Sequence, residues 1–182
     1  MIGTDGVGLR LVLEEDLPLI ARWRVDEQMG AMFHSLTLVS ETGLGKWFRD
    51  LLGDPTRMRF MIQRLRDGAT IGIVGLEHID YRNQVAELAG LIIDPRERKR
   101  GWGSMALNTL IRYGFDDLNL HRLYARIYAS NIAARCVAEK VGLQQEGIAH
   151  HAVYHNWDYE DVAYMAILRE EWKHESFRTA AV

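Results

Sequence analysis

The spacing of the hydrophobic positions changes several times along this chain, and each change predicts a new element. Leu9 to Leu13 predicts a first strand, and the residues from about Asp16 onward predict a helix. A second helix is predicted between Ser40, a suitable N-cap residue, and Gly53, which suits a helix C-terminus. Its predicted apolar face consists of Leu44, Trp47, Phe48, Leu51 and Leu52.

Strands follow, and toward the C-terminus they alternate with helices. Arg59 to Arg64 and Thr70 to Glu77 predict a hairpin, because Asp67-Gly68 between them suits a tight turn. Ala86 to Ile93 is a largely apolar strand, which favours a central place in the sheet. The remaining predictions are a long helix carrying Leu107, Leu110, Ile111 and Phe115, a strand over Leu120 to Tyr128, a helix over Ile132 to Val141, and a hairpin of Glu146 to Tyr154 with Asp161 to Leu168. This order predicts an α/β fold with a mixed sheet.

Composition and charge favour one globular domain over residues 1–182. Hydrophobic residues make up 48% and charged residues 26%, and a net charge of -3 attracts neither nucleic acid nor an anionic membrane. The single cysteine, Cys136, excludes an intrachain disulfide and a cysteine-based metal site. We find no signal peptide and no apolar run of membrane-spanning length, so we expect a cytoplasmic protein.

The segment around Gly101, between a predicted strand and a predicted helix, carries the most informative chemistry. Gly101 and Gly103 let the backbone approach a ligand closely, and the helix that follows would point its free N–H groups at that ligand. Arg98 and Arg100 add charge-assisted donors. Together these features predict a pyrophosphate-binding loop.

Other interpretations of this loop stay open on the residues alone. The dinucleotide fingerprint tolerates Ala106 at its third glycine position, but the acidic strand end that should follow is missing. The Gly-Lys-Ser/Thr of a mononucleotide loop is absent. An enzyme acting on a nucleotide phosphate, and a surface turn with solvated arginines, remain as alternatives.

Several motifs in order along the chain carry a resemblance to a known family. Arg98-x-x-Gly101-x-Gly103 after an apolar strand resembles the acyl-CoA-binding motif of the GNAT superfamily of N-acyltransferases, closest to its RimJ/RimL-type and spermidine-type acetyltransferases. The other matching segments are Leu9-Arg10-Leu11, Asp16-Leu17, Leu118 to Leu123, Asn131 to Leu143, Glu146-Gly147 and Asp161-Val162. The resemblance implies a GNAT-like, mostly antiparallel mixed sheet of about seven strands, twisted, flanked by helices and splayed at the acyl-CoA site.

The same resemblance implies that acetyl-CoA is the co-substrate and that no metal takes part. In that family the backbone of the strand before the loop binds the pantetheine arm, one of its N–H groups polarises the thioester carbonyl, and the loop wraps the pyrophosphate. Carried over to this sequence, the coenzyme-binding residues are Leu91, Ile92, Ile93, Arg98, Lys99, Arg100, Gly101, Trp102, Gly103, Ser104 and Asn131.

Transfer to an amine needs a base for the ammonium group and benefits from an acid for the leaving thiolate. Glu87 is the candidate base, acting through a water molecule, with Glu77 and His78 in reserve. The alternative interpretation of Glu87 is a carboxylate that faces solvent or pairs with an arginine. For the acid, relatives place a tyrosine or a serine on the Asn-led helix, where this chain has Ala138 and Ala134.

The identity of the acid therefore stays open. Cys136 on the same helix is interpreted as a small buried thiol. Solvent could protonate the thiolate, and so could Tyr154 or Tyr159 of the last hairpin; Tyr154 is our catalytic candidate. Because the usual acid is missing, a catalytically silent acyl-CoA-binding sensor is the alternative to an enzyme.

The acceptor is a small amine (a polyamine, aminoglycoside or amino sugar) or a peptide N-terminus, by the same resemblance. Carboxylates at Asp26, Glu27 and Glu41 would suit a polyamine, whereas a protein N-terminus would want an open groove. The other residues in the regions that select the acceptor are Trp23, Phe33, His34, Trp47, His150, His151, Tyr154, His155 and Trp157. A homodimer is a family expectation.

Overall fold

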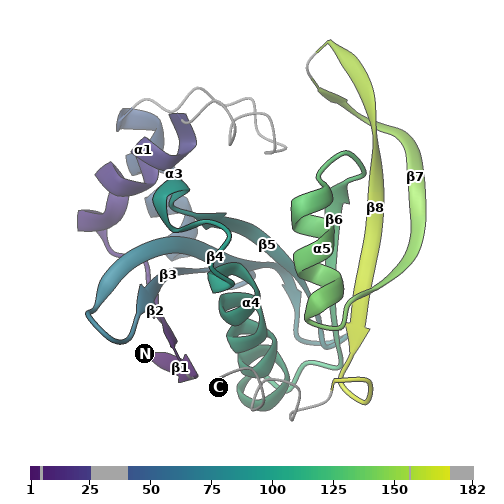
Figure 1. Ribbon diagram of the computed structural model, residues 1–182, viewed down its shortest axis with the longest axis horizontal. Helices are drawn as coiled ribbons and strands as arrows, with labels where there is room; N and C mark the ends of the chain where they lie inside the picture. The colour runs from purple at the N-terminus through teal and green to yellow at the C-terminus, as the bar shows by residue number, and fades with distance from the viewer. Residues whose placement is uncertain (5, 26–40, 156, 173–182) are drawn as a thin grey trace.

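Within residues 1–4, 6–25, 41–155 and 157–172, which this computed structural model describes, eight strands form one twisted sheet (Figure 1). The strand order is β1-β2-β3-β4-β5-β6-β8-β7, and the β5–β6 pair is parallel whereas the other neighbours are antiparallel. The strands are β1 (Ile2–Thr4), β2 (Val7–Leu11), β3 (Met58–Arg64), β4 (Ala69–Asp80), β5 (Val85–Ile93), β6 (Arg122–Tyr128), β7 (Gln144–His155) and β8 (Asp158–Leu168). The predicted mixed, mostly antiparallel sheet is confirmed, with β1 as an additional short strand.

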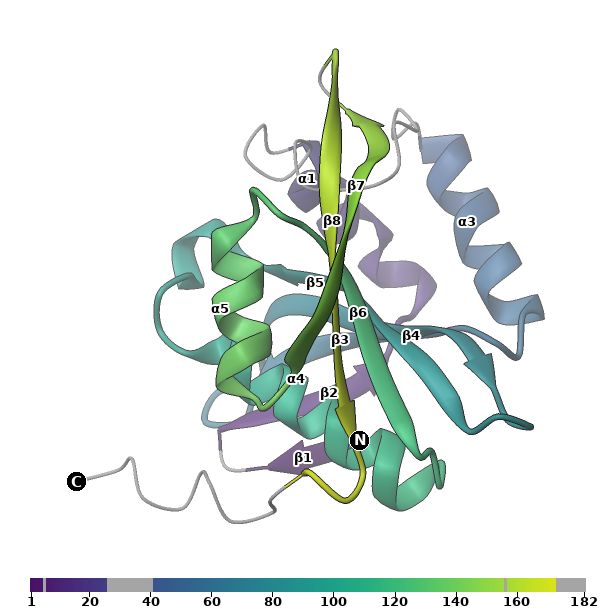
Figure 2. The same cartoon turned by 90° about the vertical axis from the view of Figure 1, so that its right-hand side faces the viewer.

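Helices cover both faces of this sheet (Figures 1 and 2). α1 (Leu17–Val25) and α3 (Glu41–Gly53) lie on one face, and α4 (Trp102–Arg112) and α5 (Ile132–Lys140) lie on the other. The short turns are η1 (Glu14–Asp16), η2 (Pro95–Glu97) and the π-helical η3 (Tyr113–Asp117). No helix in the described part of the chain is long and apolar enough to cross a membrane.

The alternation of side chains along the strands fills two separate cores. Met61, Ile73 and Ile92 pack with Trp23 and Phe48 on the α1 and α3 face. The core on the α4 and α5 face includes Phe60, Ile62, Val74, Leu76, Leu88, Leu107, Leu110, Ile111, Phe115 and Ala138. Strand register therefore decides which helices each polar side chain of the sheet meets.

The sheet splits open between β5 and β6. These two strands pair only through Val85 with Arg122, Ala86 with Leu123 and Glu87 with Tyr124. Beyond these pairs β5 continues beside β4 while β6 continues beside β8, so the strands diverge (Figure 1). The predicted splay is present. A bulge opposite β4 reinforces it at Gly90, whose φ is +64°.

Two predictions about burial are wrong, and a predicted helix cap lies outside the described residues. Cys136, interpreted from the sequence as a small buried thiol, is exposed on α5. Leu52 continues the helical spacing of α3, but its side chain is 70% exposed, because it lies at the edge of the stripe formed by Leu44, Phe48 and Leu51. The proposed N-cap Ser40 falls outside the residues that the structure describes.

Candidate active site

The split between β5 and β6 opens into a cleft of about 1200 Å³. Its walls come from both diverging strands, from the starts of α4 and α5, and from α1 and α3. Most of the residues predicted from the sequence line it: Glu87, Leu91, Ile92, Ile93, Arg98, Lys99, Gly101, Trp102, Gly103, Ser104 and Asn131. Arg100 and Tyr154 do not belong to this lining.

Strand alternation gives the cleft two chemically different ends. On β5, Leu88 and Leu91 pack toward the α4 core, whereas Ile92 packs toward α1 and α3. The glycine-containing loop and the starts of α4 and α5 therefore form one end. The other end, on the α1 and α3 face, receives the charged side chains of Glu77 and Glu87.

A network of hydrogen bonds fixes the turn that leads from β5 into the loop. The Asp94 carboxylate accepts from the backbone N–H and from the guanidinium of Arg96, at 3.0 and 3.1 Å, and from the Trp23 indole at 3.0 Å. The Arg96 hydrogen bond is the largest of the contacts that hold the pKa of Asp94 far below its usual range, against the effect of burial. Asp94 thus anchors the loop to α1.

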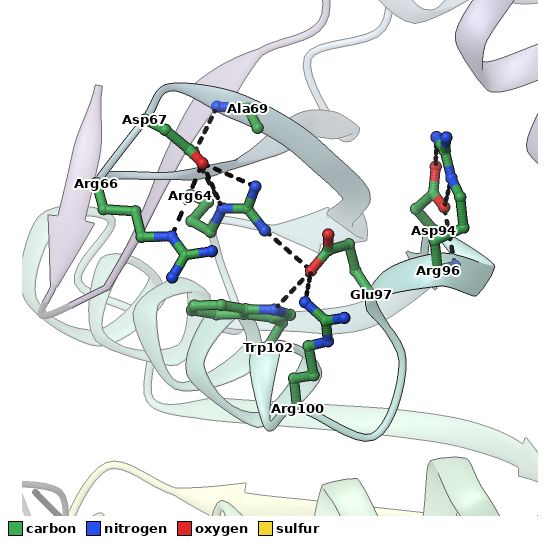
Figure 3. Close-up of polar contacts among 9 residues, drawn as sticks. All are labelled: Arg64, Arg66, Asp67, Ala69, Asp94, Arg96, Glu97, Arg100 and Trp102. Atoms are coloured by element: carbon green, nitrogen blue, oxygen red, sulfur yellow. Dashed lines mark hydrogen bonds and ion pairs between the residues drawn. The ribbon is translucent and has the colours of Figure 1, made fainter.

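Glu97 holds the far side of the same loop (Figure 3). Its carboxylate accepts from Arg64 at 3.0 Å, from Arg100 at 3.2 Å and from the Trp102 indole at 3.3 Å. Burial opposes its ionisation, but the Arg64 hydrogen bond and the nearby positive charges outweigh burial and lower the pKa of Glu97. Arg100 therefore binds Glu97, while Arg98, whose Nε donates to the Ile93 carbonyl at 3.4 Å, lines the cleft.

Backbone groups at two helix starts face the cleft. Gly101 is the N-cap of α4 and has φ +83°, a left-handed conformation that favours glycine. Asn131 caps α5 through its Oδ1, which accepts from the Ala134 N–H at 3.0 Å. That bond leaves the Asn131 Nδ2 donors available to a ligand. Both helix starts present N–H groups suited to anions or amide carbonyls.

Glu87 lies at the point where β5 and β6 separate, and its side chain is only 5% exposed. One carboxylate oxygen accepts from Arg126 Nε at 3.0 Å, and the other is 2.9 Å from both Arg126 Nη2 and His78 Nδ1. The arginine-paired alternative for Glu87 is thus observed. Pairing does not withdraw Glu87 from the site, since it still lines the cleft.

Tyr154, the predicted proton donor, does not line the cleft, whereas Tyr128 does. Tyr154 lies on the outer part of the β7–β8 hairpin, 53% exposed, with its ring 5.2 Å from that of Tyr159. Tyr128, at the end of β6, is 3% exposed and lines the cleft. Burial, with a smaller effect of Glu160, raises the pKa of Tyr128, so its hydroxyl is protonated at neutral pH. The alternation of β6 gave no sign that this tyrosine would meet a cavity.

A group of arginines on the α1 and α3 face escaped the sequence reasoning. Arg59 donates to the Ala89 carbonyl at 3.1 Å and to the Glu77 carboxylate, and Arg57 reaches Glu77 at 3.4 Å. Arg24 lies over the Trp47 ring at 5.2 Å. One feature of the sequence could have indicated this group: Arg59 is a charged residue next to three buried hydrophobic positions of one strand.

The candidate acceptor residues have mixed outcomes. Trp47 lines the cleft, while Trp23 is a core residue, 1% exposed. Outside the cleft lining are His150, His151 and Trp157 of the β7–β8 hairpin. Outside the residues or side chains that the structure describes are Asp26, Glu27, Phe33, His34, Glu41 and His155.

Comparisons with known proteins agree with this architecture. A family model for the acetyltransferase (GNAT) domain matches residues 7–144. A putative ribosomal N-acetyltransferase, YdaF, of Bacillus subtilis is 33% identical over 111 residues, which are 61% of this chain and 60% of the relative's length. Spermidine N(1)-acetyltransferase of Vibrio cholerae is 30% identical over 123 residues, 68% of this chain and 70% of that protein.

The fold has a close structural counterpart. The crystal structure of spermidine N-acetyltransferase from Vibrio cholerae in complex with CoA and spermine superimposes with a TM-score of 0.85 at 26% identity. The superposition covers 92% of this chain and 98% of that one. Since the family model spans most of the chain and the splayed sheet is present, the protein belongs to the GNAT family of acetyltransferases.

Proposed function

We propose that this protein is an N-acetyltransferase that moves an acetyl group from acetyl-CoA to a primary amine by direct attack in a ternary complex. The observation that supports this most is the split between β5 and β6, which joins the glycine-containing loop on one face to a charged pocket on the other. The acceptor class is a small amine, such as a polyamine, aminoglycoside or amino sugar, or a peptide N-terminus. Relatives with spermidine and ribosomal N-acetyltransferase names support both possibilities.

The residues of the cleft fit acetyl-CoA. The β5 backbone from Leu91 to Ile93 borders the split and could pair with the pantetheine amides, while Arg98 and the α4 N-terminus would receive the pyrophosphate. Asn131 Nδ2 would donate to the arm from α5. When bound, the coenzyme supplies a thioester carbonyl for the amine to attack.

Two proton transfers fall to the residues of the chain. An alkyl ammonium with a pKa of roughly 10 must lose a proton before it attacks. We propose that Glu87 accepts this proton through a water molecule, because its carboxylate is fixed by Arg126 and lines the cleft. The leaving thiolate needs a proton donor. Tyr154 stays the donor predicted from the sequence, and the position of Tyr128 in the cleft supports it as a second candidate for that donor.

Two measurements on the intact chain test this function. Acetyl-CoA should raise the melting temperature more than ATP or NAD does, since a ligand that binds only the folded state stabilises it. Thiol release with a panel of amines should then identify turnover. Stabilisation without thiol release from any amine would favour the silent sensor, and no stabilisation by any CoA species would contradict the proposed function.

The assembly is part of the proposal. Spermidine N-acetyltransferase from Vibrio cholerae has a dodecameric structure. We propose that this chain also forms a homo-oligomer, a dimer or a larger assembly, which light scattering coupled to size-exclusion chromatography would measure directly. A monomeric mass at micromolar concentration would contradict it.

A further inference from the structure

We propose that the amine acceptor carries an anionic group, a carboxylate or a phosphate, which Arg24 and Arg57 bind on the α1 and α3 face of the cleft. This inference rests on the proposed acetyl transfer and names the chemical class of its acceptor. It separates the acceptor from the polyamines, which carry only positive charge.

The balance of charge in this end of the cleft is the first argument. Among the described residues that line this end, four cationic side chains face two carboxylates, of Glu77 and Asp50; the cations are Arg24, Lys46, Arg57 and Arg59. A third carboxylate, Glu87, is already paired with Arg126. A polyamine would bring further positive charge to a pocket that holds an excess of it, which costs energy at reduced dielectric constant.

Glu77 is committed to the arginine that lies deepest. Arg59 is 8% exposed and donates both to Glu77 and to the Ala89 carbonyl, so its role is to support the strand. Arg57 shares the same Glu77 oxygen at the longer distance of 3.4 Å. One carboxylate oxygen thus serves two arginines, and Arg57 keeps donors that can reach a ligand.

Arg24 is the arginine whose surroundings most favour a bound anion. It lines the cleft half-buried, with its guanidinium carbon 5.2 Å from the centroid of the Trp47 ring. No carboxylate among the side chains that the structure describes forms an ion pair with it. Burial lowers the pKa of Arg24, Arg57 adds to the lowering and Glu77 opposes it. A bound carboxylate or phosphate would accept two parallel hydrogen bonds from this fork.

Three four-carbon amines that differ only at the far end test the inference: 4-aminobutyrate, butylamine and putrescine. Thiol release with acetyl-CoA should give kcat/KM for 4-aminobutyrate roughly 10- to 100-fold above butylamine, the range expected for a charge-assisted hydrogen bond, and putrescine should be the poorest. A second pair, phosphoethanolamine against ethanolamine, distinguishes phosphate from carboxylate as the preferred group.

Variants assign the effect to the arginine. Arg24→Gln should remove the preference for 4-aminobutyrate, measured as the ratio of its kcat/KM to that of butylamine, and Arg24→Lys should retain part of that preference. Arg49→Gln is the matched control, because it removes the same charge from an exposed position of α3 outside the cleft lining. Its preference should match the wild type.

The outcomes separate this inference from the proposed function. Putrescine or spermidine turned over faster than 4-aminobutyrate would overturn the anionic acceptor and leave acetyl transfer intact. If no amine releases thiol, a thermal shift on the CoA-saturated protein still decides the acceptor class. Stabilisation by 4-aminobutyrate that is lost in Arg24→Gln would support the inference, and its absence would overturn it.

Discussion

Glu87 is fixed by polar contacts and still lines the cleft. Its two oxygens are fixed by Arg126 and His78, yet it lines the cleft at the point where the strands part. We expect Glu87→Gln to lower kcat by about 10² or more, the usual contribution of general base catalysis, with acetyl-CoA affinity changed less than about threefold. Steady-state kinetics and a coenzyme titration measure the two effects separately.

A structural role would give a different result. Glu139→Gln is the control, since Glu139 is an exposed carboxylate on α5 outside the cleft lining, and its kcat should equal the wild type. If Glu87→Gln keeps wild-type turnover between pH 6 and 9, Glu87 serves only to pair with Arg126.

The two tyrosines make a second prediction at this scale. Tyr128→Phe should lower kcat by roughly 10-fold or more if its hydroxyl protonates the thiolate, because Tyr128 is buried in the cleft. Tyr154→Phe should leave kcat within about twofold, because its ring lies against Tyr159 outside the lining. The opposite ranking would return the role of acid to Tyr154.

The sequence identified residues best where a motif fixes their position. Gly101 and Asn131 sit at helix starts, which local spacing can predict. Arg24 lies on α1, far along the chain from Arg57 and Arg59 at the start of β3, and only the packing of α1 on the sheet brings the three around Glu77. Charge alone could not separate these arginines from ordinary surface arginines.

At the scale of the element, the loop before α4 depends on two glycines in different ways. Gly101→Ala should destabilise the fold by about 1–2 kcal/mol, because φ +83° strains any residue with a Cβ, although the space around it is open. Gly103→Ala should keep or slightly raise stability, since its Cβ would make ordinary 3.7 Å contacts to Ile93 and Leu91. It should instead weaken acetyl-CoA binding, because Gly103 lines the cleft.

Urea unfolding and coenzyme titration of the two variants form one matched experiment. Stability loss confined to Gly101→Ala and affinity loss in a stable Gly103→Ala would support the assigned roles. Equal stability of both variants would show that the left-handed conformation at Gly101 is not required.

The turn after β5 predicts a dependence on pH. Hydrogen bonds from Arg96 and Trp23 lower the pKa of Asp94 in the folded protein below the value of about 3.9 for an unfolded aspartate. The folded state therefore binds fewer protons. Asp94 contributes its full stability above the unfolded pKa, and this contribution is lost as the pH falls through the folded pKa. Asp94→Asn should be less stable at pH 7, and its difference from the wild type should shrink below about pH 4.

Denaturant titrations at pH 7, 5 and 3 measure this difference. Asp117→Asn, at an exposed position of η3, is the control, and its difference from the wild type should stay small throughout. A gap between wild type and Asp94→Asn that widens toward acid would contradict the role given to Asp94.

Long elements with a clear period were predicted within a few residues of their observed bounds, as β3, β5 and α5 show. β1 was missed because three residues cannot display a period, and its pairing with β2 through Ile2 and Leu9 depends on tertiary contacts. Leu52 was placed on the buried stripe of α3 because spacing does not reveal where that stripe ends.

At the scale of the whole molecule, the split sheet predicts which segments a bound ligand protects from amide hydrogen exchange. Residues 88–93 pair with β4 on one side and, within the described chain, with no strand on the other. Acetyl-CoA should slow amide hydrogen exchange in residues 88–93 and 98–104 and leave β1 and β2 unchanged, which mass spectrometry of peptic fragments measures. Uniform protection of all strands would instead indicate global stabilisation without a local site.

The split could not be predicted from the periodicity of the chain. β5 and β6 each read as ordinary strands, and the point where they part depends on a register of three residue pairs and on the bulge at Gly90. The expectation of a splayed sheet came from the resemblance of the motifs to a family, and the fold confirms it.

Arg59 lies beside that bulge and contacts both the acceptor end of the cleft and strand β5. It donates to Glu77 on the α1 and α3 face and to the Ala89 carbonyl of β5, and a Cβ at Gly90 would come within 3.0 Å of its guanidinium. An acceptor that binds Glu77 or its arginines would therefore also act on the strand that we propose receives the coenzyme. Such coupling is reciprocal, so each substrate must change the affinity of the other by the same factor, whichever binds first.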